Sequence, residues 1–176
     1  MTTELADGLV DGAPAARQRM DSFEEFVLAT GDRLLRAAVL LTGDRHAADD
    51  LVQSAYATAF ARWRLGSRAD NPVAYTRQLM FRVYLADRRR KRVTELPLSV
   101  DAPAGGRDPA LRLTLLEALA TLASLDRAVL VLRYFEDLPV TEVAAQLSLT
   151  ESACRTRASR ALAKLRTAFP DLADED

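Results

Sequence analysis

The sequence predicts an all-α protein made of two small helical domains joined by a flexible linker, with a helix-turn-helix in the second domain. Apolar residues recur at three-four spacing along most of the 176 residues, and no segment shows sustained strand-like alternation with hairpin signals. Glycine and proline are sparse inside the periodic segments and collect between them, above all in residues 93–109. The chain is therefore expected to fold as two groups of helices.

The first predicted domain covers residues 21–92 and contains three helices. Ser22 starts a capping box, which predicts that the first helix begins beside it. Gly43 is expected to end that helix, and Asp44 can cap the next one. Asn71–Pro72 opens the third helix, because proline is tolerated where the backbone amide has no helical partner.

The second predicted domain covers residues 110–169 and follows a linker, residues 93–109. The linker holds three prolines and a glycine pair and shows no helical period. The predicted helices of this domain begin at Pro109 and then span Ser124–Phe135, Val140–Leu147 and Thr150–Phe169. The two ends of the chain are expected to lie outside both domains, residues 1–20 as a disordered extension and residues 170–176 as an acidic tail.

Charge is distributed unevenly along this chain, although its formal net charge is only -1. Residues 72–92 hold seven basic side chains against one acidic side chain, and residues 150–169 hold five against one. Two separate basic segments in a neutral protein indicate two contacts with a polyanion, since each phosphate bound by Lys or Arg releases counterions. The alternative is that these arginines are solvated and favoured by helix dipoles.

Composition also predicts several absences. No apolar run approaches the roughly 20 residues of a membrane-spanning helix, and no secretory pattern opens the chain, so we expect a cytoplasmic protein without a membrane partner. One cysteine, Cys154, and one histidine, His46, exclude an internal disulfide and leave too few ligands for a zinc site. No nucleophile–base pair or phosphate loop is present, so we assign no catalytic residue, cofactor or metal.

The strongest local signal is a helix-turn-helix in residues 140–165, where a short helix, a Ser148–Leu149 turn and a Thr150-capped helix follow one another. Ser148 occupies a position that usually carries glycine, so a left-handed conformation there is expected to cost about 1 kcal/mol. Helical spacing places the small and apolar side chains inward, namely Cys154, Ala158, Ala161, Leu162 and Leu165. The outward face then carries Ser152, Arg155, Thr156, Ser159 and Arg160, which suits contact with DNA bases and phosphates.

Four segments, taken in order, resemble the extracytoplasmic-function (ECF) group of RNA polymerase sigma factors, in particular the actinobacterial type. The segment LTGDRHAADDLVQSAYATA at Leu41–Ala59 is similar to the polymerase-binding segment of that group, and NPVAY at Asn71–Tyr75 is similar to the start of its promoter-melting helix. LRYFEDL at Leu132–Leu138 and ESACRTRASRALAKLR at Glu151–Arg166 resemble its second DNA-binding domain and recognition helix. The resemblance covers residues 21–169.

The resemblance implies a protein that binds core RNA polymerase and directs promoter recognition and melting, with residues 21–92 as region 2 and residues 110–169 as region 4. Polymerase-binding residues, expected to face the clamp helices of the largest subunit, are Asp49, Asp50, Leu51, Val52 and Gln53. The loop Leu65–Asn71 and the helix behind it are expected to capture the opened minus-ten element. Candidate DNA contacts outside the outward face of the recognition helix are Asn71, Arg82, Arg88, Arg89 and Arg157. An anti-sigma factor is a further partner that the resemblance makes plausible.

Two other functions are weighed against this one. A response-regulator type of transcription factor carries a similar helix-turn-helix, but it needs an α/β receiver domain, and the first 90 residues here are predicted to be helical. A protein-binding adaptor, with its acidic N-terminal segment against a basic partner, is the second alternative. Promoter-sequence dependence of binding distinguishes the adaptor from the sigma factor.

Overall fold

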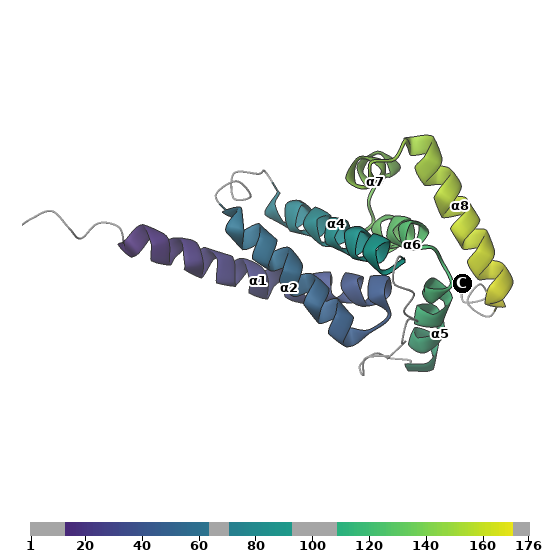
Figure 1. Cartoon of the computed structure of the whole chain (residues 1–176), viewed down its shortest axis with the longest axis horizontal. Coiled ribbons are helices and arrows are strands. Elements are labelled where there is room, and N and C mark those ends of the chain that lie inside the picture. Colours follow the sequence, from purple (N-terminus) through teal and green to yellow (C-terminus); the bar gives the residue numbers. More distant parts are fainter. Residues whose placement is uncertain (1–12, 64–70, 93–108, 171–176) are drawn as a thin grey trace, which may run out of the picture.

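The computed structural model describes residues 13–63, 71–92 and 109–170, and the regular elements in this part of the chain are helices (Figure 1). In chain order these are α1 (Ala13–Thr42), α2 (Arg45–Ala61), α4 (Pro72–Arg92), α5 (Pro109–Ala120), α6 (Ser124–Leu130), the π-helical turn η1 (Val131–Phe135), α7 (Val140–Leu147) and α8 (Glu151–Ala168). The prediction of an all-α fold is confirmed.

The helices form two groups that lie against each other. In Figure 1, α1, α2 and α4 run lengthwise beside one another, and α2 contacts both of its neighbours. Helices α5 to α8 gather at one end of these three, with α8 packed on α6 and α7. The predicted linker falls outside the described residues, except for Pro109, which begins α5.

Helix α1 begins earlier than the sequence analysis predicted. It starts at Ala13, so residues 13–20 are helical rather than disordered, and Ser22 lies inside the helix instead of capping it. The segment APAARQRM explains the difference, because alanine and arginine are strong helix formers and proline is tolerated in a first turn. Residues 1–12 lie outside the described part of the chain.

The other predicted boundaries of the first group are confirmed. Gly43 follows α1 with a φ of 75°, a left-handed conformation that suits glycine. The Asp44 carboxylate accepts a hydrogen bond of 2.7 Å from the backbone amide of Ala47 and so caps α2. The Asn71 side-chain oxygen accepts a hydrogen bond of 3.0 Å from the backbone amide of Ala74, and Pro72 is the first residue of α4.

The predicted helix Ser124–Phe135 changes its winding midway. It is α-helical to Leu130 and continues as the π-helical turn η1, in which the backbone amide of Glu136 donates to the carbonyl of Val131 at 3.0 Å. Asp137 follows in a left-handed conformation, with a φ of 53°. This irregular segment leaves Glu136 only 5% exposed, which is unusual for a carboxylate.

Buried side chains of both groups form one continuous cluster. It joins residues of α1 and α4, such as Leu41 and Phe81, to residues of α5 and η1, such as Leu116 and Leu132. Direct contacts run from α1 to α5, α6 and η1, and from α4 to α6. The two groups are therefore docked on each other through apolar side chains as well as through the polar contacts described below.

Arg127 of α6 is a buried cation at the contact between the groups. It is 3% exposed, and its guanidinium donates to the backbone carbonyls of Leu41, at 2.7 Å, Ala120, at 3.1 Å, and Leu122, at 3.2 Å. The first two carbonyls belong to the last turns of α1 and α5, which lack helical partners and carry partial negative charge. Burial lowers the pKa of Arg127, but an arginine side chain stays protonated in proteins.

We predict that Arg127→Ala lowers the free energy of unfolding by about 3 kcal/mol, because it leaves buried carbonyls without a donor. Urea denaturation followed by circular dichroism measures the change. Arg45→Ala is the control, since Arg45 pairs with Asp49 on the exposed surface of α2 and its loss should change the free energy by less than about 1 kcal/mol. Equal urea midpoints for Arg127→Ala and the unmodified protein would contradict the role given to Arg127.

Candidate nucleic-acid interface

The predicted helix-turn-helix is present as α7, a tight turn and α8. Ser148 adopts the left-handed conformation, with φ 56° and ψ 43°, and the backbone amide of Leu149 donates to the carbonyl of Ala144 at 2.9 Å. The Thr150 hydroxyl then accepts a hydrogen bond of 3.1 Å from the backbone amide of Ala153 and caps α8. Both the strained serine and the threonine cap agree with the prediction from sequence.

The inward face of α8 fixes the helix on the second group. Cys154, Ala158 and Ala161 are buried, and Leu162 and Leu165 pack against the core at partial exposure. Burial raises the pKa of the Cys154 thiol, which keeps it protonated and suits a packing role. Helix α8 is therefore held from one side, and its opposite side is left at the surface.

The outward face of α8 is exposed, as predicted, along its first three turns. All five predicted residues are exposed, namely Ser152, Arg155, Thr156, Ser159 and Arg160. An open cavity of about 440 Å³ lies on one side of this face and is lined by Asp126, Thr150, Ser152, Ala153, Thr156, Arg157 and Arg160. Another, of about 240 Å³, lies on the other side and is lined by Arg133, Tyr134, Val140, Arg155, Ala158, Ser159, Leu162 and Arg166. The face is thus a ridge that can enter a groove of a partner.

The arginines of α8 differ in how firmly they are held. Arg155 pairs with Glu151 at 2.7 Å, but both side chains are exposed, so the pair contributes little and can be exchanged for another anion. Arg157 pairs at 2.7 Å with Asp126 of α6, and it joins α8 to α6. Arg160 makes no ion pair within the described part of the chain. Arg155 and Arg160 are therefore more available to DNA than Arg157.

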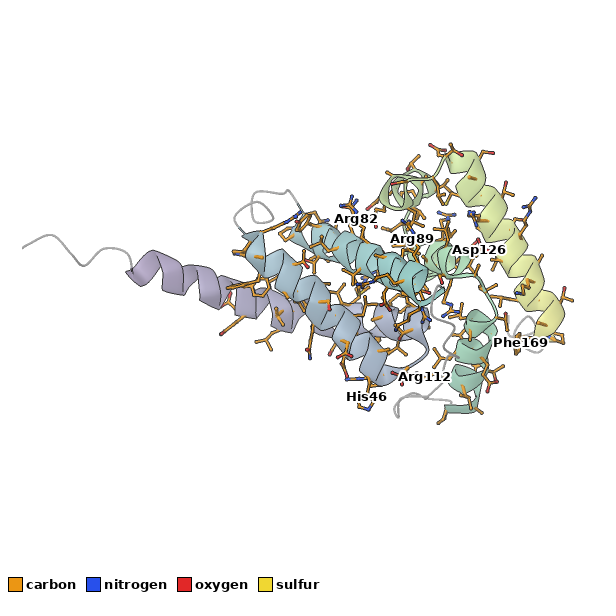
Figure 2. All side chains as sticks on the ribbon, in the orientation of Figure 1. His46, Arg82, Arg89, Arg112, Asp126 and Phe169 are labelled. Carbon is orange, nitrogen blue, oxygen red and sulfur yellow. The ribbon has the colours of Figure 1, made fainter. Side chains whose placement is uncertain are left out.

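The predicted DNA contacts on α4 are also at the surface, with differences between them. Arg82 and Arg89 are exposed (Figure 2), whereas Arg88 is half-buried and its guanidinium lies 5.5 Å above the ring of Tyr84. Asn71 is exposed, but its side-chain oxygen caps α4. Residues 65–70 of the predicted minus-ten loop lie outside the described residues.

Docking of the two groups brings the two basic segments together. A cavity of about 300 Å³ between them is lined by Leu85, Arg88 and Arg89 of α4, by Ala123, Ser124 and Leu125 at the start of α6, by Leu147 of α7 and by Arg157 of α8. Arg89 and Asp126 are labelled in Figure 2 on the facing ends of α4 and α6. The sequence analysis did not predict this convergence.

The predicted polymerase-binding segment of α2 divides into surface and core residues. Asp50 and Gln53 are exposed, and Asp49 is half-exposed and pairs with Arg45 at 3.1 Å. Leu51 and Val52 are only 7% and 8% exposed. These two side chains pack in the core and support the helix from within, and their part in polymerase binding stays a prediction.

A buried ion cluster joins the groups, and the sequence analysis missed it. Arg77 of α4 pairs at 3.2 Å with Glu136, which follows η1, and at 3.1 Å with Glu142 of α7. Arg33 of α1 reaches the same Glu136 oxygen at 3.2 Å. The side chains of Arg77 and Glu136 are only 9% and 2% exposed. The sequence did contain a sign that Arg77 is buried. Its spacing places it on the same face of the helix as the buried Met80, Phe81 and Tyr84.

Comparisons with known proteins identify the family. The model of sigma-70 region 4 matches residues 112–165, the part that contains the helix-turn-helix. An RNA polymerase sigma-E factor of Streptomyces coelicolor is 34% identical over 149 residues, which cover 82% of this chain and 84% of that protein. The chain belongs to the ECF group of sigma factors. It therefore acts with RNA polymerase in transcription initiation and belongs to a non-enzymatic family, which excludes the response-regulator and adaptor alternatives.

Solved structures agree with the fold of this sigma factor. The sigma factor RpoE in complex with the anti-sigma factor NepR, from Bartonella quintana, superposes with a TM-score of 0.74 at 20% identity, covering 88% of this chain and 99% of that one. CnrH in complex with the cytosolic domain of CnrY superposes with a TM-score of 0.61 at 27% identity, covering 93% and 96%. Within the described residues, no helix is long and apolar enough to span a membrane.

We predict that Ser148→Gly raises the free energy of unfolding by about 0.5 to 1 kcal/mol, because glycine adopts the left-handed conformation without strain. Gly43→Ala is the matched opposite change. It should lower the free energy by about 1 kcal/mol through the same strain, since a β-carbon at Gly43 would meet no atom within 4 Å. Urea denaturation of both variants tests the prediction, and a stability loss in Ser148→Gly would contradict it.

Proposed function

We propose that this sigma factor reads the minus-thirty-five element with the outward face of α8, reads the minus-ten element with α4, and contacts polymerase with the exposed edge of α2. In this proposal residues 21–92 act as region 2 and residues 110–169 as region 4. The observation that supports it best is the exposed ridge of α8, which combines small hydroxyl side chains with two available arginines. Small side chains let a helix approach base edges, and arginine binds guanine or phosphate.

Arg155 is the best candidate for base readout in α8. It lies early in the second helix of the motif, where side chains reach base edges in known helix-turn-helix complexes. Its partner Glu151 is exposed, so DNA can replace that carboxylate at small cost. Arg160 lies one turn further on, where the helix leaves the groove, and we assign it a backbone phosphate.

The exposed basic side chains of α4 support a contact with the minus-ten element. Arg82 and Arg89 are available at the surface, and Arg88 is partly held by Tyr84. Their charge would bind phosphates on either side of the melted bases, while Asn71 caps α4 and is the last residue of the segment that we assign to base capture. An extruded base needs only a few kcal/mol of unstacking once the duplex is weakened.

The acidic edge of α2 supports a contact with the clamp helices of the largest polymerase subunit. Asp50 and Gln53 are exposed on a helix whose opposite side, including Leu51 and Val52, is fixed in the core. Charges on such a rigid surface set the encounter rate and the register with a basic partner. We also infer a cytoplasmic location, where polymerase and promoters are found.

An anti-sigma factor is a further proposed partner. The fold of this chain is similar to that of RpoE, which was solved in complex with the anti-sigma factor NepR. A protein that binds across both helical groups would hold them together and keep α8 and α4 from separate promoter elements. Co-purification of the tagged full chain from its own cells tests for such a partner.

We predict that Arg155→Ala relaxes base preference at one or two positions of the minus-thirty-five element, because a bidentate arginine contributes about 1 to 3 kcal/mol against a wrong base. Arg160→Ala should weaken binding to all sequences alike and reduce its salt dependence. The measurement is transcription of a randomised upstream-element library by each variant with core polymerase. Arg36→Ala on α1 is the matched control, and an unchanged preference at every position in Arg155→Ala would refute this assignment.

We further predict that Asp50→Lys weakens association with core polymerase about tenfold or more, because it places a like charge against a basic surface. A fluorescence titration of labelled sigma factor with core polymerase measures the affinity. Asp32→Lys makes the same charge change at an exposed site of α1 and should leave the affinity unchanged. Equal losses in the two variants would indicate a general charge effect and would count against the α2 contact.

A further inference from the structure

The cavity between the two helical groups is lined by arginines from both of them. Arg88 and Arg89 of α4 and Arg157 of α8 line it, and no acidic side chain does so among the described residues. The rest of the lining consists of Ser124, which offers a hydroxyl, and of alanine and leucine side chains. These three arginines, here named the junction arginines, are far apart in the sequence and converge only in the folded chain.

Positive charge around this cavity exceeds the negative charge that the described residues place there. Asp126 forms an ion pair of 2.7 Å with Arg157, whereas Arg88 and Arg89 make no ion pair within the part of the chain that the structure describes. Burial lowers the pKa of Arg127, the residue after Asp126, and the nearby charge of Arg88 lowers it further. The guanidinium groups therefore lie close enough to repel one another, and an anion bound between them would relieve that repulsion.

The shape of the cavity favours a small ligand over duplex DNA. Its volume of about 300 Å³ lies at the lower end of the range for small-molecule sites. It is a recess among α4, α6, α7 and α8, whereas a helix that reads DNA presents a protruding face, as α8 does with its ridge. Leu85, Leu125 and Leu147 form part of the wall, and apolar walls reduce the screening of charges beside them.

We propose that the junction arginines bind a small ligand with two linked phosphate groups, either an inorganic diphosphate or the diphosphate end of a nucleotide. Each phosphate carries about 1.5 to 2 negative charges near pH 7, so two linked groups suit a site with several cations. A guanidinium presents several N–H donors in a planar fork that matches phosphate oxygens. Arg157 can bind through the donors that its hydrogen bond to Asp126 leaves unused. The site does not depend on the promoter contacts proposed above.

The junction arginines differ in how firmly the fold holds them. Arg88 and Arg157 are half-buried, and the Arg88 guanidinium lies 5.5 Å from the centre of the Tyr84 ring. These two side chains are held in place before a ligand arrives, which reduces the conformational entropy that binding must remove. Arg89 is exposed and can close on a bound phosphate from the solvent side. Replacing Arg89 therefore removes a ligand contact without disturbing the core.

Isothermal titration calorimetry of the full-length chain with inorganic pyrophosphate tests the site. Orthophosphate is the comparison with a single phosphate, and the ionic strength is held constant so that screening is the same in every titration. We expect pyrophosphate to bind at least about tenfold more tightly than orthophosphate, because two linked phosphates engage more of the arginines. Equal affinities for the two anions would overturn the proposal, and so would the absence of pyrophosphate binding.

A pair of matched variants separates the cavity from the basic surface of α4. Arg89→Gln should weaken pyrophosphate binding about tenfold, because it removes charge-assisted hydrogen bonds. Arg82→Gln makes the same change at an exposed site of the same helix, outside the cavity, and should change the affinity less than about twofold. Comparable losses in the two variants would show a general attraction of anions to α4 and would overturn the site.

Chemical protection locates the ligand on the unmodified chain, without any substitution. Saturating pyrophosphate should slow the reaction of Arg88 and Arg89 with phenylglyoxal, measured by mass spectrometry, and leave that of Arg82 unchanged. Protection of Arg88 and Arg89 by duplex DNA but not by pyrophosphate would overturn the proposal and assign the cavity to the DNA backbone.

The source of the diphosphate is distinguished by a titration with a nucleoside diphosphate. Binding tighter than that of pyrophosphate would support a nucleotide, whose base or sugar then contacts the leucine wall. Binding weaker than that of pyrophosphate would support the inorganic anion. In either case the loss caused by Arg89→Gln should be about tenfold, because the same phosphate contacts are removed.

Discussion

The buried guanidinium of Arg127 is the contact on which the arrangement of the two helical groups depends. It binds the last turn of α1 and the end of α5 together, and so fixes where the second group begins relative to the first. No carboxylate pairs with it in the described residues, and its charge is balanced by backbone carbonyls at helix C-termini. A cation in that place needs both groups to be docked, because neither supplies all of the acceptors alone.

The docking of the two helical groups determines which basic side chains are paired and which remain exposed. Arg77 is neutralised by Glu136 and Glu142, Arg157 is held by Asp126, and Arg88 lies over an aromatic ring, whereas Arg82 and Arg160 remain at the surface. Although the net charge of the chain is close to zero, its basic side chains therefore differ in how far they are paired and how far they are exposed. Arg77 is thus paired in the contact between the groups, whereas Arg82 and Arg160 are exposed side chains that we assign to DNA under the proposed function.

The two surfaces that we propose for DNA and polymerase are alike in that each lies on a helix that is packed along one side and exposed along the other. Cys154 and Ala158 hold α8, and Leu51 and Val52 hold α2, so that their outward residues are presented on rigid supports. Such support limits the conformational entropy that binding must remove. It also explains why the family resemblance in α2 includes core residues, since they set the register of the exposed ones.

The sequence by itself determined the local structure, because caps and helix faces depend on residues only a few positions apart. Asp44, Thr150 and Ser148 could each be interpreted from their neighbours, and so could the outward face of α8. The start of α1 was predicted wrongly, because the extension of a helix beyond a possible cap is decided by weak helix preferences and by packing. Only the tertiary structure placed Arg77 against Glu136, 59 residues away, because that ion pair exists only where two separately encoded helical groups meet.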